Sequence, residues 1–304
     1  MMFKSILPRI HGLFTVRNLV IAVPMVWLFA LAAAPLLLVL DISLAHMNIT
    51  SVSSLWHWGD DELTLKFNFG NYLYLGDDSL YFKTYLSSLK FAAVTTLYCL
   101  VLGYPFAYFI ARAPAHLRSV MLMLVMLPFW TSFLLRIYAW KALLADNGVV
   151  NQGLAELGLV TSPLHMMHTS FSLTIGMVYA YLPFMVLPLY ATLVKLDGRM
   201  LEAAADLGAS PFKTFWLVTV PLTKRGIIAG SLLVFIPAFG EYVIPELLGG
   251  PRTLMIARVL WDEFFSNNDW PMASAVTIVM ILLILVPMAL FNRYNDETKL
   301  GDKS

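Results

Sequence analysis

A carboxylate lies inside an otherwise apolar stretch of the chain, where it could bind a cation. Glu241 follows Pro237 and Gly240, which can open a helix backbone, and Tyr242 comes directly after it. A carboxylate beside an aromatic ring suits an ammonium ion, because charge pairing acts together with a cation–π attraction of about 0.5–2 kcal/mol. We therefore predict that Glu241 contacts a cationic substrate. A structural ion pair with Arg136 or with a neighbouring subunit is the alternative.

Arg136 and Glu246 are also charged residues within apolar stretches. A charge in a membrane span costs about 2.5–3.5 kcal/mol on insertion scales, so such residues usually face other helices or water. Arg136 either snorkels to the membrane surface beside Tyr138 and Trp140 or pairs with a carboxylate that holds helices together. Glu246 lies nearer the end of its stretch than Glu241 and could close the outer end of a path.

No combination of residues in the sequence predicts an enzyme. A GxxxxGK[ST] loop is absent, so the chain has no recognisable way to hold a nucleoside triphosphate. His165 and His168 have helical i, i+3 spacing but no third ligand nearby, so we predict no metal site. The single cysteine, Cys99, is predicted to be a small buried residue. We expect no catalytic residue, no cofactor on this chain and no nucleic-acid partner, so the energy for any work must come from a partner or a gradient.

The composition places the chain among membrane proteins. Of its 304 residues, 59% are hydrophobic and 13% are charged. A membrane helix needs about 20 mostly apolar residues. We therefore predict an all-α integral membrane protein without strands, whose proline-containing helices are kinked and packed around a path. The six predicted spans are residues 19–40, 91–111, 119–140, 171–194, 226–248 and 270–291.

The positions of Lys and Arg predict the orientation of these spans. Placing both termini, the 112–118 loop and the 195–225 loop in the cytoplasm puts 13 of the 20 basic residues inside, as the positive-inside rule expects. The loops on the other side are rich in acidic residues. The predicted segments are a cytoplasmic N-terminus (1–18), a first membrane helix (19–41), a periplasmic loop (42–85), a core (86–292) that contains the cytoplasmic loop 195–225, and a cytoplasmic tail (293–304).

A polar segment, residues 197–211, separates the fourth and fifth predicted spans. Asp197 can cap a first short helix, and Gly208 can end it in the left-handed conformation. Ser210 can cap a second helix that has Pro211 at its first position. The small residues between Ala203 and Ala205 leave one helix face flat. We therefore predict two short helices that meet at an elbow and present a docking surface to another protein.

The spacing within this loop resembles the EAA loop of ABC-importer permeases. Glu202-Ala203-Ala204 is followed after three residues by Gly208, and after nine more by Val218-Thr219-Val220-Pro221, where the family usually has Ile-x-Leu-Pro. The resemblance implies that this loop sits in a cleft of an ATPase subunit. An ordinary amphipathic turn between two membrane helices is the alternative. The residues that it assigns to ATPase coupling are Glu202, Ala203, Ala204, Asp206, Gly208 and Pro221.

Four further segments resemble the permeases of polyamine (putrescine or spermidine) importers: 127–140, 180–188, 239–251 and 262–271. The resemblance runs from about Val20 to Phe291. It implies a type I importer permease fold, in which an extra first span precedes five core spans. The residues that we then predict along the substrate path are Trp130, Arg136, Tyr138, Tyr181, Glu241, Tyr242 and Glu246.

The resemblance also implies the partners of the chain. They are two ATPase subunits that hold ATP and Mg, a second permease that forms a heterodimer with this chain, a periplasmic polyamine-binding protein and the lipid of a bacterial inner membrane. A related importer for ferric ion, sulfate or a small peptide is the alternative within this class. A gradient-driven carrier or channel is the alternative outside it. Which amine is preferred stays open at this point.

Overall fold

The computed structural model describes residues 16–47, 52, 56–59, 62–65 and 67–301. Two compact units make up the chain: residues 1–74 with 263–279, and residues 75–262 with 280–304. The predicted N-terminal segment 1–18, the loop 42–85 and the tail 293–304 therefore each lie partly outside the described residues.

The first unit begins with the long helix α2 (Val16–Ser43). The chain that leads into α3 (Gly70–Asp77) folds back onto the end of α2. The Asn68 backbone N–H donates to the Leu44 carbonyl at 2.8 Å, and Asn71 Nδ2 donates to the Ser43 carbonyl at 3.0 Å. The hydroxyls of Ser43 and Tyr72 share a hydrogen bond of 2.7 Å. The two bonds to carbonyl oxygens satisfy acceptors at and just beyond the end of the helix, which have no intrahelical partner.

A short hairpin in the first unit corrects the prediction that the chain has no strands. β1 (Trp56–Gly59) pairs antiparallel with β2 (Glu62–Leu65), and Trp56 lies opposite Leu65. Apolar and polar residues alternate in both segments, and this period of two is the pattern of a strand. Each strand has only four residues, so a search for apolar stretches of about 20 residues does not detect it.

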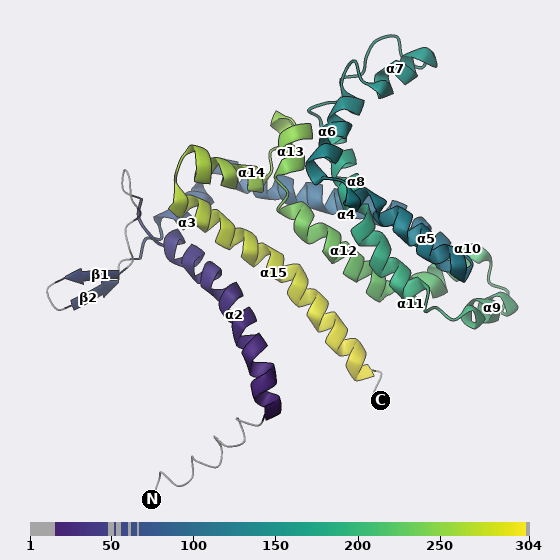
Figure 1. Cartoon of the computed structure of the whole chain (residues 1–304), viewed down its shortest axis with the longest axis horizontal. Coiled ribbons are helices and arrows are strands. Elements are labelled where there is room, and N and C mark those ends of the chain that lie inside the picture. Colours follow the sequence, from purple (N-terminus) through teal and green to yellow (C-terminus); the bar gives the residue numbers. More distant parts are fainter. Residues whose placement is uncertain (1–15, 48–51, 53–55, 60–61, 66, 302–304) are drawn as a thin grey trace, which may run out of the picture. The chain divides into compact units, whose positions relative to one another are not determined.

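The second unit is built from helices. Three of them, α4, α8 and α12, pack against one another and lie side by side in Figure 1. Its helices are α4 (Ser79–Arg112), α5 (Ala115–Met126), η1 (Leu127–Trp130), α6 (Phe133–Leu144), α7 (Val149–Glu156), α8 (Ser170–Leu193), α9 (Gly198–Asp206), α10 (Pro211–Thr214), η2 (Phe215–Thr219), α11 (Val220–Leu222), α12 (Lys224–Phe239), α13 (Val243–Leu248), η3 (Pro251–Thr253) and α14 (Ile256–Trp261). The segment η4 (Asp262–Ser266) and the last helix, α15 (Trp270–Gly301), follow them.

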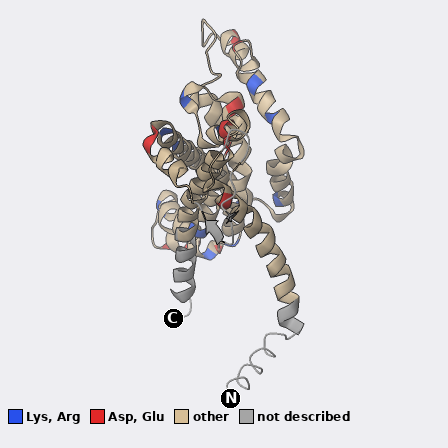
Figure 2. Cartoon of the chain, turned by 90° about the vertical axis from the view of Figure 1, so that its left-hand side faces the viewer, with Lys and Arg blue, Asp and Glu red and all other residues tan. Residues whose placement is uncertain are grey.

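The six predicted spans correspond to four continuous helices and two bent pairs. Helical segments 20–43, 79–112, 170–193 and 270–289 are long and apolar enough to cross a membrane. The pair 115–130 and 133–156 bends by 87°, and the pair 211–222 and 224–239 bends by 68°. The predicted span 119–140 is interrupted between Trp130 and Phe133, and 226–248 is interrupted after Phe239. Kinked helices were predicted, but the positions of these breaks were not. Figure 2 shows the long runs of uncharged residues along these helices.

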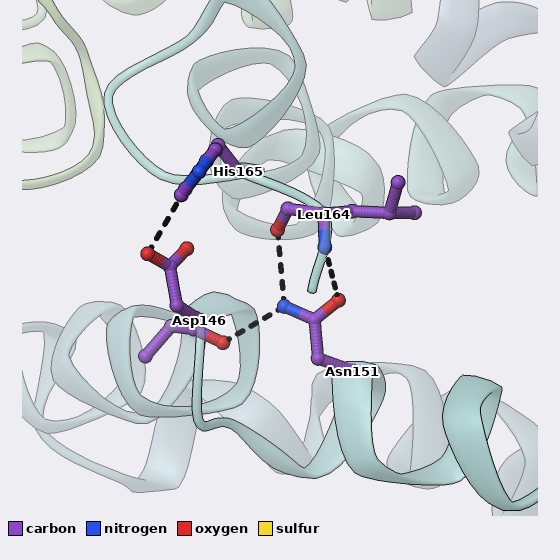
Figure 3. A network of polar contacts seen from close by, with 5 residues as sticks. Asp146, Asn151, Leu164 and His165 are labelled. Carbon is purple, nitrogen blue, oxygen red and sulfur yellow. Dashed lines mark hydrogen bonds and ion pairs between the residues drawn. The ribbon is translucent and has the colours of Figure 1, made fainter. Parts of the chain in front are cut away.

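The connection from α6 to α8 is held together by polar contacts, which Figure 3 shows. Asn151 is buried; its Nδ2 donates to the Leu164 carbonyl at 3.0 Å, and its Oδ1 accepts from the Leu164 N–H at 2.9 Å. His165 Nδ1 lies 2.9 Å from Asp146 Oδ2. His168 instead contacts the Gly249 carbonyl through Nδ1. Within the described part of the chain, no three His, Cys, Asp or Glu residues form a group that could hold a metal.

Glycines allow the close approach of α8 and α12. A Cβ atom on Gly226 would meet the Thr192 side chain and would lie 3.0 Å from the Pro188 carbonyl oxygen. A Cβ atom on Gly230 would lie 2.8 Å from Met185 Sδ. Protein interiors are close-packed, so even one added methyl group is felt there. Cys99, on α4, is fully buried, as predicted.

We predict that Gly226→Ala lowers the stability of the protein by about 1–3 kcal/mol, because the methyl group overpacks this contact. The thermal unfolding midpoint of the purified chain in detergent measures the effect. Gly153→Ala is the matched control, since nothing lies within 4 Å of a Cβ atom on Gly153 in α7. That substitution should be neutral or stabilising by about 0.5–1 kcal/mol. Equal effects of the two variants would contradict the packing argument.

Candidate functional site

Glu241 is buried where one helix stops and the next begins. α12 ends at Phe239 and α13 begins at Val243. Glu241 Oε1 accepts the backbone N–H groups of Val243 at 2.9 Å and Ile244 at 3.2 Å. Its Oε2 accepts a hydrogen bond from the Tyr181 hydroxyl on α8. The carboxylate therefore satisfies N–H groups that the start of a helix leaves free, and it ties that start to a second helix.

The neighbours of Glu241 differ from those that the sequence predicted. The predicted alternative, an ion pair between Glu241 and Arg136, is absent from the structure. Tyr242 does not supply the aromatic neighbour either, because its ring stacks on Trp261 with centroids 4.6 Å apart. Tyr181 takes that place. Sequence spacing could not reveal this contact, since 60 residues separate Tyr181 from Glu241.

Arg136 lies between two aromatic rings. Its guanidinium carbon is 5.0 Å from the centroid of Phe129 and 5.7 Å from that of Phe133. The Nε and Nη1 atoms are buried and have no hydrogen-bond partner among the described residues. The structure therefore supplies cation–π attraction and not the carboxylate pairing that was one of the two predicted alternatives. Burying donors without acceptors costs about 1–3 kcal/mol each, and more when they are charged.

Ring contacts connect Arg136 with Glu241. Phe129 packs edge-on against Phe184 on α8, with centroids 5.2 Å apart, and Phe184 lies 6.2 Å from Tyr181. α6 packs against both α8 and α13. Three of the predicted path residues, Arg136, Tyr181 and Glu241, thus belong to one continuous cluster, which η1, α6, α8 and the link between α12 and α13 build. Phe129 and Phe184, which join them, lie in two of the segments singled out in the sequence, but neither was predicted as a path residue.

Trp130 and Tyr138, two other predicted path residues, are not part of this cluster. The Trp130 side chain is 78% exposed and that of Tyr138 is 51% exposed. Neither residue makes a ring contact among those described above.

Glu246 belongs to a separate ion cluster. Its Oε2 lies 2.5 Å from Arg258 Nη1, and Arg258 Nε lies 3.9 Å from Asp262 Oδ2. Arg258 is on α14 and Glu246 is on α13, so the ion pair joins two short helices. Sequence analysis missed Arg258. Its i, i+4 spacing to Asp262 could have indicated that ion pair, but not the pair with Glu246.

The loop at 197–211 has the local structure that the sequence predicted. Asp197 accepts the Arg199 N–H at 3.0 Å, and Ser210 accepts the Lys213 N–H at 3.4 Å. Gly208 has a φ of 78°, in the left-handed region, and Pro211 stands in the first turn of α10. The elbow between α9 and α10 therefore follows from capping residues alone.

The elbow presents apolar side chains that none of the described residues covers. Leu207 is 89% exposed and Phe212 is 73% exposed, and Leu217 nearby is also exposed. Contiguous exposed apolar surface of this kind marks an interaction site. The predicted coupling residues Glu202, Ala203, Asp206, Gly208 and Pro221 are exposed as well, and Ala204 is half-buried.

Comparisons with known proteins agree on the class of this chain. The family described as "binding-protein-dependent transport system inner membrane component" matches residues 100–299. The spermidine/putrescine transport system permease protein PotB of Escherichia coli is 44% identical over 82% of this chain and 92% of its own length. PotB of Haemophilus influenzae is 38% identical over 92% of this chain and 94% of its own length.

A solved structure supports the predicted fold. A chain of a bacterial ABC transporter that imports the acidic polysaccharide alginate superposes with a TM-score of 0.69 and 14% identity. The match covers 95% of this chain and 99% of the other. The prediction of an all-helical importer permease fold is therefore confirmed, apart from the added hairpin.

We predict that Arg136→Met leaves the stability unchanged or raises it by up to about 4 kcal/mol, because an apolar side chain replaces a half-buried charge whose Nε and Nη1 are buried without acceptors. The thermal unfolding midpoint of the purified chain tests this. Arg252→Met, at an exposed position, is the control and should have little effect. A loss of about 3 kcal/mol or more at position 136 would mean that the guanidinium has a partner after all.

Proposed function

Because the chain belongs to the family of binding-protein-dependent transport system inner membrane components, we propose that it moves polyamines across the membrane as the permease subunit of an ABC importer. It is a multi-pass inner-membrane protein and a transport subunit, not an enzyme. The observation that carries the substrate class is the similarity to two spermidine/putrescine permeases over most of both chains.

The proposed binding group for a substrate ammonium is the Glu241 carboxylate. It is buried, it lies at a break between two helices, and one of its oxygens accepts a hydroxyl proton that an ammonium N–H could replace. Tyr181 then offers the ring face for a cation–π contact. Replacing the hydroxyl by an ammonium group needs little rearrangement, because the other carboxylate oxygen can keep its bonds to the N–H groups at the start of α13.

The other proposed path residues have less direct support. Arg136 has no carboxylate partner among the residues that the structure describes, and it repels cations. It would therefore keep the amine away from its own side of the path rather than bind it. Glu246, paired with Arg258, would act at the outer end. The proposed path consists of Trp130, Arg136, Tyr138, Tyr181, Glu241, Tyr242 and Glu246.

The proposed ATPase contact is the surface around Glu202, Gly208 and Pro221. Its exposed apolar side chains support this role, because only a partner protein would cover them. In this proposal ATP and Mg are held by two ATPase subunits, a second permease completes the path, and a periplasmic polyamine-binding protein delivers the substrate. In the same proposal, both termini and the loop 195–225 face the cytoplasm. The loop 42–85 then faces the periplasm.

We predict that Glu241→Gln lowers polyamine uptake at least about tenfold, the equivalent of about 1.4 kcal/mol in the barrier. The amide oxygen can still cap α13, so the change removes chiefly the charge. Uptake of labelled putrescine and spermidine by the reconstituted importer measures the effect, with unlabelled ferric ion, sulfate and peptide as competitors.

The matched control is Glu156→Gln, which makes the same change at an exposed site in α7 and should leave uptake unaltered. Loss of complex assembly in Glu241→Gln would instead indicate a structural role for this carboxylate. Competition by sulfate, ferric ion or peptide, without competition by amines, would overturn the substrate class.

We predict that Glu202→Arg abolishes both uptake and substrate-stimulated ATP hydrolysis, because a reversed charge on α9 disrupts the ATPase contact. The chain should still insert into the membrane, which fractionation can verify. Copurification of the ATPase with the tagged permease reports the contact directly. Normal copurification and normal uptake in this variant would refute the coupling role.

A further inference from the structure

Phe215 occupies the junction between the elbow at 197–211 and the membrane helix α12. It begins η2, a π-helical segment of five residues, Phe215–Thr219. π-Helical turns within α-helices are rare and occur frequently at functional sites. η2 packs against α9, α10 and α11, so it lies directly behind the surface proposed to meet the ATPase.

The Phe215 ring is wedged against two tyrosines of α4. Its centroid is 5.4 Å from that of Tyr104 at an angle of 86°, and 6.4 Å from that of Tyr108 at 80°. Tyr104 and Tyr108 are four residues apart, so their side chains share one face of α4. Edge-to-face packing at these separations is a favourable geometry for aromatic pairs.

A hydrogen bond ties the other end of the same segment to the same tyrosine. Tyr104 Oη and Thr223 Oγ1 are 2.8 Å apart, and Thr223 is fully buried. Thr223 Oγ1 also donates to the Thr219 carbonyl at 2.8 Å. The stretch from Phe215 to Thr223 is therefore fastened to α4 at both of its ends.

Aromatic contacts continue from Phe215 to the exposed surface. Phe215 lies 5.3 Å from Trp216, and Trp216 lies 6.3 Å from Phe212. Trp216 is 54% exposed and Phe212 is 73% exposed, whereas Phe215 is half-buried. One unbroken series of rings thus runs from the elbow surface into α4.

We propose that Phe215 transmits displacement of the elbow to α4, with Tyr104 and Tyr108 receiving it. The inference rests on the proposed contact between the elbow and an ATPase. Packed rings have little room to move apart or together, so a push on the elbow shifts α4 instead of being absorbed in the π-helical turn. α4 packs on α8, which carries the Tyr181 hydroxyl that holds Glu241. Phe215 is in this sense a positioning residue for transport.

The test is Phe215→Ala in the complete importer, reconstituted in proteoliposomes with its ATPases, second permease and binding protein. Assembly and basal ATP hydrolysis should stay within about twofold of wild type, and the amount of putrescine transported per ATP should fall by about fivefold or more. Phe215→Tyr retains the ring and should restore the ratio. Phe215→Leu retains apolar volume without the ring edge and should give an intermediate ratio.

A double variant tests whether Phe215 acts on α4 through Tyr104. If Phe215 acts through Tyr104, then Phe215→Ala combined with Tyr104→Ala should lower the ratio no further than the stronger single variant does. An unchanged ratio in Phe215→Ala, or strictly additive losses in the double variant, overturns the proposal. A loss of ATPase copurification in Phe215→Ala also overturns it, since Phe215 would then serve docking or folding.

The Glu202→Arg variant separates this inference from the function on which it rests. If Glu202→Arg abolishes uptake while Phe215→Ala keeps the wild-type ratio, only the role of Phe215 is wrong. If Glu202→Arg transports normally, the elbow is not the ATPase contact, and the proposed function fails first.

Discussion

A helix that begins within an apolar stretch of the chain needs acceptors for its first N–H groups, and this requirement shapes the junction between α12 and α13. Water is scarce there, so the acceptor must come from the protein. The Glu241 carboxylate supplies it for α13 and takes the Tyr181 hydroxyl from α8 with its other oxygen. The same side chain therefore both fixes a helix start and joins two helices.

Local sequence determined much of what could be predicted. The elbow at 197–211 was predicted correctly because a capping side chain, a left-handed glycine and a first-turn proline act on their own neighbours. The spans were located because their length and hydropathy are properties of continuous sequence. The breaks within the third and fifth spans were not located, since prolines also occur within helices that remain continuous, such as α8 with Pro183 and Pro188.

Contacts between distant segments could not be predicted in the same way. Tyr181 meets Glu241, and Arg258 meets Glu246, only because α8, α13 and α14 are brought together in space. Arg136 was expected either to reach the membrane surface or to pair with a carboxylate, and the structure places its guanidinium beside two rings. The hairpin was missed for a different reason: four-residue strands show too few alternations to stand out beside apolar helices of 24 to 34 residues.

Met185 on α8 has a consequence for motion. A Cβ atom on Gly103 of α4 would lie 3.1 Å from its Cγ, and one on Gly230 of α12 would lie 2.8 Å from its Sδ. The thioether is unbranched and has three rotatable bonds, so it can change shape without a change in volume. Met185 can therefore adapt by bond rotation to a change in the spacing of α4, α8 and α12, which a stiff β-branched side chain at this position could not do.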